Sequence, residues 1–549
     1  MSESKQIAKK MNRTGKILLT GLMFAAFSIG AQEVDKKILN WYNGKKFGMS
    51  TDKAYKKILA DKKSEPVVVA VIDSGVDIEH EDLQGSIWVN EDEIAGNGID
   101  DDNNGYIDDR NGWNFLGNAD GENINAEQLE VTRLYDKLNE KYKDLSKADV
   151  PEEDKAEYER YKSYRDEVEG KRSQATSGIS QYTGLIEKYK AAEAKLKKKF
   201  GGDFTAKQLK SIKDDAEYAG AVELMMGLTK AGLGADFVEE QFEGIIDYYQ
   251  GQLDHHYNTD FNARNIVGDD PSNFDDTNYG NSDVEGPDAM HGTHVAGIIA
   301  ATRGNGIGND GVASNVQIMS VRAIPDGDER DKDVALAIRY AVDNGAQIIN
   351  MSFGKAYSPY KEKVIEAIRY AEEKGVLLVH AAGNSSKDIG KESNFPSPKY
   401  PSMSSEFKNW IEVGASTRYK KAKKDKKNGG FKEPGLAARF SNYNNQMVDV
   451  FAPGLEIYST IPDNKYVAIQ GTSMASPMVA GVAALLKSYY PSLTMFEIRD
   501  IIFESVQVID RDALLPGDTK EVPFAELCAS DGIVNVYNAV KLAEEKIAG

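Results

Sequence analysis

Short, nearly unbroken apolar runs alternate with segments of helical spacing along much of the chain. The run Val67–Asp73 is apolar at six of its seven positions, which is typical of a strand buried on both faces of a parallel sheet. Similar runs occupy residues 316–324, 346–354 and 376–384. Two helices are predicted between these runs, one over about 333–344 and a second that ends at residue 374. This alternation predicts an α/β fold with a doubly wound, mainly parallel sheet flanked by helices.

Residues 122–257 have a different pattern, in which apolar side chains recur at spacings of three and four. The two clearest stripes, separated by lysine and glutamate, are Leu134, Leu138, Tyr142 and Leu145, and Val238, Phe242, Ile245 and Tyr249. They predict a helical insertion into the α/β domain. We expect its apolar stripes to pack on one another, with partner binding as the alternative.

The first 31 residues have the pattern of a secretory signal peptide. Four basic residues between positions 9 and 16 precede an apolar run over residues 17–29 that ends in Gly30 and Ala31. A short segment over residues 32–64 follows, and residues 65–121 and 258–549 are predicted to form the α/β domain. No later apolar run reaches the roughly 18 to 20 residues that a membrane span requires. We therefore expect an exported protein, periplasmic or extracellular, without a membrane span.

The chain of 549 residues is acidic, with 67 lysines and arginines against 87 aspartates and glutamates and a net charge of −20. This balance argues against a nucleic-acid partner and favours cation binding. The only cysteine, Cys528, excludes an internal disulfide. Stability should therefore come from packing or from bound ions, and we expect a monomer.

Four polar residues lie at ends of predicted elements, where ligands bind in open α/β sheets. Asp73 and Asn384 end strands, His291 begins a segment of small and apolar residues, and Ser473 in GTSMASPMVAG begins another helical pattern. A serine at such a place is usually a helix cap. A lone histidine is more often a satisfied core residue, so each residue alone indicates little.

Together these residues supply the parts of an acyl-transfer site. A serine nucleophile needs a base, the imidazolium that results needs a buried carboxylate, and the oxyanion needs fixed hydrogen-bond donors. Ser473, His291, Asp73 and Asn384 are candidates for these roles. The backbone N–H of Ser473, at a helix N-terminus, is the candidate second donor to the oxyanion.

Three longer motifs carry a resemblance to a known family. VVVAVIDSGVD, HGTHVAGIIA and GTSMASPMVAG occur in the order Asp, His, Ser, and they resemble the signature blocks of the subtilisin-like serine proteases of secreted bacterial type. INMSFG, VHAAGN and VDVFAPG are also similar to family segments. The resemblance covers about residues 65–115 and 258–545 and implies a subtilisin-like fold and a serine endopeptidase acting on polypeptides.

The resemblance also implies roles for individual residues. Asp73, His291 and Ser473 would form the catalytic triad, and Asn384 would donate to the oxyanion. Two further segments would bind the substrate peptide as an added strand; their residues are Ser352, Phe353, Gly354, Ala381, Ala382 and Gly383.

An acidic segment over residues 96–112, GNGIDDDNNGYIDDRNG, has the spacing of a calcium loop. The candidate ligands occupy alternate positions: Asp100, Asp102, Asn104, Tyr106 and Asp108. Gly105 permits a sharp turn, although Asn111 stands where an EF-hand loop has glutamate. We predict a structural Ca²⁺, and the alternative is a solvated acidic turn.

Two other functions compete with a secreted endopeptidase. One is a catalytically inert binding or scaffold protein whose working part is the helical insertion. The other is a metal-dependent hydrolase built on His255, His256, His291 and Asp73, although neither a His-Glu-x-x-His helix nor a cysteine cluster supports it.

Overall fold

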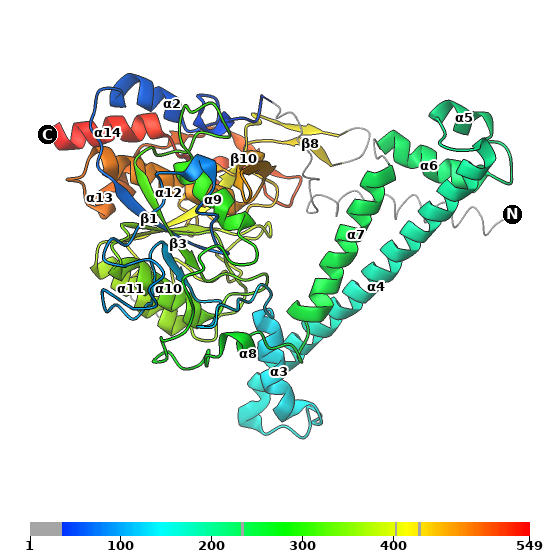
Figure 1. Ribbon diagram of the computed structural model, residues 1–549, viewed down its shortest axis with the longest axis horizontal. Helices are drawn as coiled ribbons and strands as arrows, with labels where there is room; N and C mark the ends of the chain where they lie inside the picture. Colours follow the sequence, from blue (N-terminus) through cyan, green and yellow to red (C-terminus); the bar gives the residue numbers. More distant parts are fainter. Residues whose placement is uncertain (1–35, 232–234, 401–402, 404, 426–429, 549) are drawn as a thin grey trace. The chain divides into compact units, whose positions relative to one another are not determined.

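The structure is a computed structural model (Figure 1) that describes residues 36–231, 235–400, 403, 405–425 and 430–548. The chain divides into two compact units, one formed by Glu33–Glu130 with Asn262–Gly549 and the other containing Val131–Phe261. The predicted insertion, 122–257, overlaps the second unit, and its boundaries stay predictions. The predicted signal peptide, residues 1–31, lies outside the described residues.

A nine-stranded sheet forms the centre of the first unit, in the order β12-β15-β9-β6-β5-β4-β1-β3-β2. Every neighbouring pair is parallel except the edge pair β12 and β15. The strands are β1 Val67–Asp73, β2 Gly112–Asn114, β3 Val316–Arg322, β4 Ile348–Met351, β5 Leu377–Ala381, β6 Trp410–Ser416, β9 Val450–Pro453, β12 Gln507–Val508 and β15 Gly532–Ile533. The predicted α/β class with a mainly parallel sheet is thus confirmed.

Helices cover both faces of this sheet, α10 and α11 on one side and α9, α12, α13 and α14 on the other (Figure 1). Alternate residues of a strand serve the two faces: Val67, Val69 and Val71 of β1 belong to the core shared with α9 and α12. The helices of this unit are α2 Thr51–Ala54, α8 Arg264–Val267, α9 Met290–Ala300, α10 Asp331–Asp343, α11 Lys361–Glu373, α12 Thr472–Tyr489, α13 Met495–Glu504 and α14 Val536–Ala548.

The chain order of the strands creates a topological switch at β1, the third strand from the β2 edge of the sheet. β1 pairs with β3 on one side and β4 on the other, so the connections leaving these strands diverge, and ligands bind at the carboxyl ends beside such a point. β3 ends two residues earlier than predicted because the backbone N–H groups of Ala323 and Ile324 turn to donate to the carbonyl of Asp73, at 3.0 and 3.2 Å.

Three small hairpins complete the first unit. They pair β7 Ala422–Lys424 with β8 Phe431–Pro434, β10 Ile457–Ile461 with β11 Lys465–Ile469, and β13 Asp512–Leu514 with β14 Glu521–Pro523. The segment before β1 also belongs to this unit, since Tyr42, Met49 and Leu59 are buried in the core that contains α9 and α12.

The second unit is helical, as the pattern of its sequence predicts. It contains most of α3 Glu130–Tyr142, then α4 Lys155–Phe200, α5 Ala206–Ser211, α6 Ala219–Ala231 and α7 Ala235–Gly251. The 46-residue α4 packs against α6 and α7. Within this unit Tyr142 joins one small apolar cluster and Phe242 packs on another, so part of the predicted stripes packs internally. In the described ranges, no helix combines the length and apolarity needed to cross a bilayer.

Candidate active site

Asp73 is the last residue of β1 and is buried, with 2% of its surface exposed. Its Oδ1 accepts a hydrogen bond from the backbone N–H of Ser74 at 2.8 Å and lies 2.7 Å from Nδ1 of His291. A carboxylate with these two partners at the switch point of the sheet is fixed in place and directed at one imidazole nitrogen.

His291 is the second residue of α9, and the glycine after it explains how this helix approaches β1. A Cβ atom on Gly292 would lie only 2.0 Å from the carbonyl oxygen of Gly75 and 3.2 Å from Cβ of Asp73. Only glycine therefore lets the first turn of α9 contact the end of β1. The dipeptide His-Gly brings the imidazole to the carboxylate.

The environment of His291 favours its protonation. Burial of the imidazole acts to lower the pKa of His291, but the charge and hydrogen bond of Asp73 outweigh that effect, so the pKa is raised above its ordinary value. The imidazole side chain is 36% exposed, against 3% for the carboxylate. Because Nδ1 is bonded to Asp73, Nε2 is the nitrogen available to a neighbouring group.

Ser473 lies in the first turn of α12 but is not its cap, because Gly471 occupies the N-cap position. The hydroxyl of Ser473 donates to the carbonyl oxygen of Ser352 at 3.2 Å, and the hydroxyl of Ser352 donates back to the carbonyl oxygen of Ser473 at 2.9 Å. In the described structure Ser473 therefore bonds to the end of β4 and not to His291.

Asn384 follows β5, and its amide is held by Thr472. Oδ1 of Asn384 accepts hydrogen bonds from the backbone N–H of Thr472 at 2.8 Å and from its hydroxyl at 3.0 Å. The same hydroxyl accepts a hydrogen bond from the backbone N–H of Gly383 at 3.0 Å. Two donors to Oδ1 fix the orientation of the amide, so Nδ2 points away from Thr472.

Two N–H groups border the space beside Gly471. A Cβ atom built on Gly471 would lie 3.5 Å from Nδ2 of Asn384 and 3.5 Å from the backbone nitrogen of Ser473. Both nitrogen atoms thus lie near one point, which a side chain at position 471 would occupy. This geometry suits an oxyanion that forms on a carbonyl attacked by Ser473.

The two predicted peptide-binding segments continue from neighbouring parallel strands. Ser352, Phe353 and Gly354 follow β4, whereas Ala381, Ala382 and Gly383 complete β5 and the turn after it. The first segment contacts Ser473 through Ser352, and the second contacts Thr472 through Gly383. The structure therefore brings both segments to the edge of the sheet that carries Ser473 and Asn384, while their binding of peptide stays a prediction.

Two of the predicted calcium ligands in the acidic segment lie close to a third carboxylate. Carboxylate oxygens of Asp100 and Asp102 lie within 4.8 Å of one another and of a third carboxylate, Glu93, which the sequence pattern did not indicate. Glu93 is 2% exposed, its Oε1 accepts the backbone N–H groups of residues 101 and 102, and its Oε2 has no hydrogen-bond partner among the described residues.

The other three predicted ligands make different contacts. Both carboxylate oxygens of Asp108 accept backbone N–H groups, from Asn97 and Gly98. Nδ2 of Asn104 donates to Asp102, and its Oδ1 accepts the backbone N–H of Tyr106. The Tyr106 ring packs edge to face on other aromatic rings.

The histidines His255 and His256 of the alternative metal-dependent site, and His294 of α9, have other surroundings. His255 and His256 belong to the helical unit, and the one group of potential metal ligands among the described residues contains no histidine. His294, one turn after His291, is fully buried with Nε2 beside the carbonyls of Ile457 and Val467, and burial lowers its pKa to about 3. It is therefore neutral and ties α9 to the β10–β11 hairpin.

Comparison with known proteins agrees with this architecture. The subtilase family model matches residues 64–522, and the chain belongs to the subtilase family. It is 39% identical over 251 residues to the thermophilic serine proteinase of Bacillus sp. (strain AK1), over 46% of this chain and 53% of that protein.

Two further relatives show the same likeness. Subtilisin DY of Bacillus licheniformis is 31% identical over 294 residues, which are 53% of this chain and 86% of the relative. Thermitase of Thermoactinomyces vulgaris is 38% identical over 199 residues, 36% of this chain and 61% of the relative. The chain thus spans only about half of the length of the first relative.

Proposed function

We propose that this subtilase is a serine endopeptidase in which Asp73, His291 and Ser473 act together on a peptide bond. The observation that carries the proposal is the 2.7 Å contact between Asp73 and His291. The nitrogen atoms of Asn384 and Ser473 that lie near one point beside Gly471 support it. The names of the relatives, which include a serine proteinase, support the same reaction.

The proposed reaction begins when the Ser473 hydroxyl turns from Ser352 toward Nε2 of His291. Oγ bonds to the scissile carbonyl carbon while its proton passes to Nε2, and Asp73 stabilises the imidazolium. The C–N bond then breaks as His291 gives this proton to the leaving amine. Water repeats the sequence on the acyl-enzyme and releases the carboxylic acid, which regenerates Ser473.

Asn384 and the backbone N–H of Ser473 would stabilise the oxyanion in both halves of the reaction. Their donors are held before the substrate arrives, one by Thr472 and the other by the start of α12, so little reorganisation is needed as the charge develops. Substrate polypeptides would lie between residues 352–354 and 381–383 as an added strand.

A serine-directed fluorophosphonate tests this proposal. We expect one label on Ser473 of the wild-type protein, identified by peptide mass spectrometry, together with hydrolysis of casein. Ser473→Ala and His291→Ala should lose both. Ser488→Ala is the matched control, because Ser488 lies on the same helix with its hydroxyl bonded to the Glu65 carbonyl. A wild-type protein without label or hydrolysis would support the inert scaffold instead.

We further propose that Glu93, Asp100 and Asp102 hold a structural Ca²⁺. The unpartnered Oε2 of the buried Glu93 within the acidic cluster fits this ion, because Ca²⁺ takes several carboxylate oxygens. When bound, the ion would offset most of the negative charge of three adjacent carboxylates and hold the 93–102 segment together. It has no part in the peptide-bond chemistry.

We also propose that the protein is exported and acts as a monomer. The apolar run over residues 17–29 and the family membership support export. Sequencing of the N-terminus of the protein in periplasmic and culture fractions tests the cleavage near residue 31, and light scattering tests the monomer.

A further inference from the structure

Arg322 is a buried arginine beside the end of β1. It ends β3 in register with Asp73, and 1% of its surface is exposed. Its guanidinium donates to three oxygens: Nε to the Ser74 carbonyl at 2.9 Å, Nη1 to Oδ1 of Asn114 at 3.0 Å, and Nη2 to the Ile124 carbonyl at 2.6 Å. All three acceptors are uncharged.

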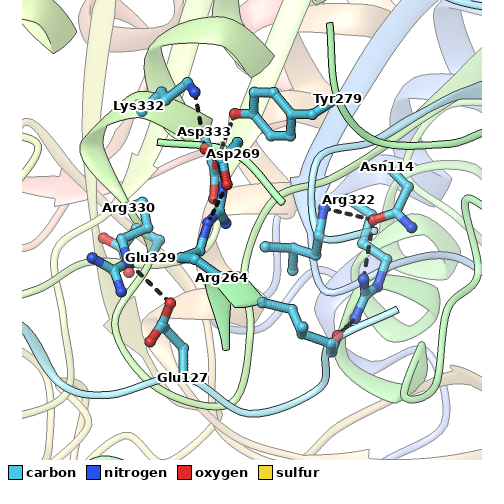
Figure 2. A network of polar contacts seen from close by, with 12 residues as sticks. Asn114, Glu127, Arg264, Asp269, Tyr279, Arg322, Glu329, Arg330, Lys332 and Asp333 are labelled. Carbon is cyan, nitrogen blue, oxygen red and sulfur yellow. Dashed lines mark hydrogen bonds and ion pairs between the residues drawn. The ribbon is translucent and has the colours of Figure 1, made fainter. Parts of the chain in front are cut away.

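The other buried cations of this unit have carboxylate partners, as Figure 2 shows for Arg264 and Lys332. Arg264 pairs with Asp269 and Asp333 at 2.6 and 2.9 Å, and Lys332 pairs with Asp269 at 2.9 Å. Arg322 instead points toward Asn114. Burial lowers the pKa of Arg322 to about 10, although the negative charges of Asp283 and Asp288 act to raise it. A buried cation without a contacting carboxylate costs stability, so the fold gains little from the charge itself.

The surroundings of Arg322 leave room for this side chain. Gly286 has a φ of +67°, and a Cβ atom there would lie 2.2 Å from Nε of Arg322. A glycine is therefore needed where the guanidinium passes. The contacts with Asn114 and Ile124 hold Nη1 and Nη2 of the guanidinium, so its Nε–H is directed toward the carbonyl oxygen of Ser74.

The main chain of Ser74 links Arg322 to the candidate active site. The backbone N–H of Ser74 donates to Oδ1 of Asp73 at 2.8 Å, and the carbonyl of the same residue accepts Nε of Arg322 at 2.9 Å. The same Oδ1 contacts His291 at 2.7 Å. A fixed residue is thus connected through one main-chain segment to the oxygen that orients the imidazole.

We propose that Arg322 is the positioning residue for Asp73. It acts through the main chain of Ser74, which it holds so that Oδ1 of Asp73 stays directed at Nδ1 of His291. This role rests on the proposed endopeptidase function and deepens it. Without the guanidinium the Ser74 carbonyl loses its buried donor, the turn after β1 relaxes, and the carboxylate no longer holds one orientation.

The test compares Arg322→Met with the wild type, using rates per active site from fluorophosphonate titration. We expect kcat on a small chromogenic peptide to fall about 10- to 100-fold with KM nearly unchanged, since small misplacements of reacting groups have effects of this size. The acidic limb of the pH profile should move to lower pH, because Asp73 no longer raises the pKa of His291. The Nδ1 proton resonance of His291 should shift or broaden.

A double-mutant cycle separates positioning from general loss of stability. In an Asp73→Asn background, Arg322→Met should have little further effect on kcat, because the carboxylate through which Arg322 acts is gone. If Arg322→Met does not fold, Arg322→Lys, which keeps a buried cation, replaces it in the measurements of kcat, the pH profile and the double-mutant cycle. Arg499→Met is the matched control, since Nε of Arg499 also donates to a backbone carbonyl, that of Trp410; it should alter only the melting temperature.

The outcomes are distinct. The wild type could be active while the Arg322 variants keep both its kcat per site and its acidic limb, and this result would overturn the positioning role alone. The same conclusion would follow if the effects of Arg322→Met and Asp73→Asn on kcat were fully additive. A wild type that neither hydrolyses casein nor labels at Ser473 would overturn the proposed function and this role together.

Discussion

Nδ1 of His291 lies 2.7 Å from Oδ1 of Asp73 although 218 positions separate the two residues in the chain. The contact joins the end of β1 to the first turn of α9, and the helical unit lies between them in sequence. Its first consequence concerns the pH dependence of the proposed reaction.

The activity should fall on the acid side with an apparent pKa above the ordinary value of about 6.5. His291 accepts a proton only when neutral, and Asp73 raises its pKa, so inactivation begins at a higher pH than for an unpaired histidine. A pH profile of kcat/KM on a chromogenic peptide measures this limb. Asp73→Asn should lower kcat about 10⁴-fold and move the limb to lower pH; an unmoved limb would contradict the assignment.

Asn384→Leu should lower kcat and leave KM within a few-fold. One oxyanion donor is worth about 10² to 10³ in kcat in a subtilisin, the case that supplies this magnitude. Thr472→Val should cause a smaller loss, because it removes the hydroxyl that orients Oδ1 of Asn384 and leaves the donor itself. Steady-state kinetics of both variants decide the point, and equal losses in kcat and affinity would indicate a substrate-binding role for Asn384 instead.

The main elements of the fold and the four candidate site residues could be predicted from local sequence. Val67–Asp73 is apolar enough to indicate a buried strand, and the motifs around His291 and Ser473 are long. The order of strands in the sheet could not be predicted, because it depends on pairing between distant segments. The contact of Arg322 with Ser74 follows from that pairing, since it requires β3 beside β1 in one register.

Other features depend on side-chain directions that the sequence does not specify. Glu93 precedes the calcium-loop pattern, so its approach to Asp100 became visible only when the chain was folded. The hydroxyl of Ser473 donates to the carbonyl oxygen of Ser352, a partner that the motif around Ser473 does not indicate. A hydroxyl rotates to the nearest acceptor, and the strength of two alternative hydrogen bonds is not encoded in a motif.

Removal of Ca²⁺ with EGTA should lower the melting temperature. A ligand that binds only the folded state at 100 times its Kd stabilises that state by about 2.7 kcal/mol. Differential scanning calorimetry measures the shift with and without the ion. Glu93→Gln should reduce the response to EGTA, while Asp120→Asn, on an exposed carboxylate in the same region, should leave it unchanged. A full response in Glu93→Gln would place the ion elsewhere.

Lys355→Met should destabilise the protein strongly. Nζ of Lys355 lies 2.9 Å from Glu130 and 2.8 Å from Asp331, and the three side chains are at most 7% exposed. Removing the cation takes an ion-pair partner from two buried carboxylates, which costs about 3 to 5 kcal/mol in the free energy of unfolding. Urea denaturation measures it. Lys363→Met, in an exposed pair with Glu366, is the control and should change the free energy by less than about 1 kcal/mol.

Replacement of Val131–Phe261 by a Gly/Ser linker tests what the helical unit does. Each unit has apolar clusters of its own, and the candidate active-site residues all belong to the other unit, so we expect the shortened protein to fold and to cleave a small chromogenic peptide. Glu130, the residue before the replaced segment, contacts Lys355, which directly follows Gly354 of the candidate peptide-binding segment.

Because this attachment lies next to the candidate peptide-binding segment, we expect the helical unit to limit which substrates enter, admitting extended peptides and excluding folded proteins. The shortened protein should then gain kcat/KM on a folded protein substrate while its kcat/KM on the peptide changes little. Fluorophosphonate titration corrects both values for inactive molecules. Equal changes on the two substrates would show that the helical unit affects stability alone, and a loss confined to the folded protein would show that it captures such substrates.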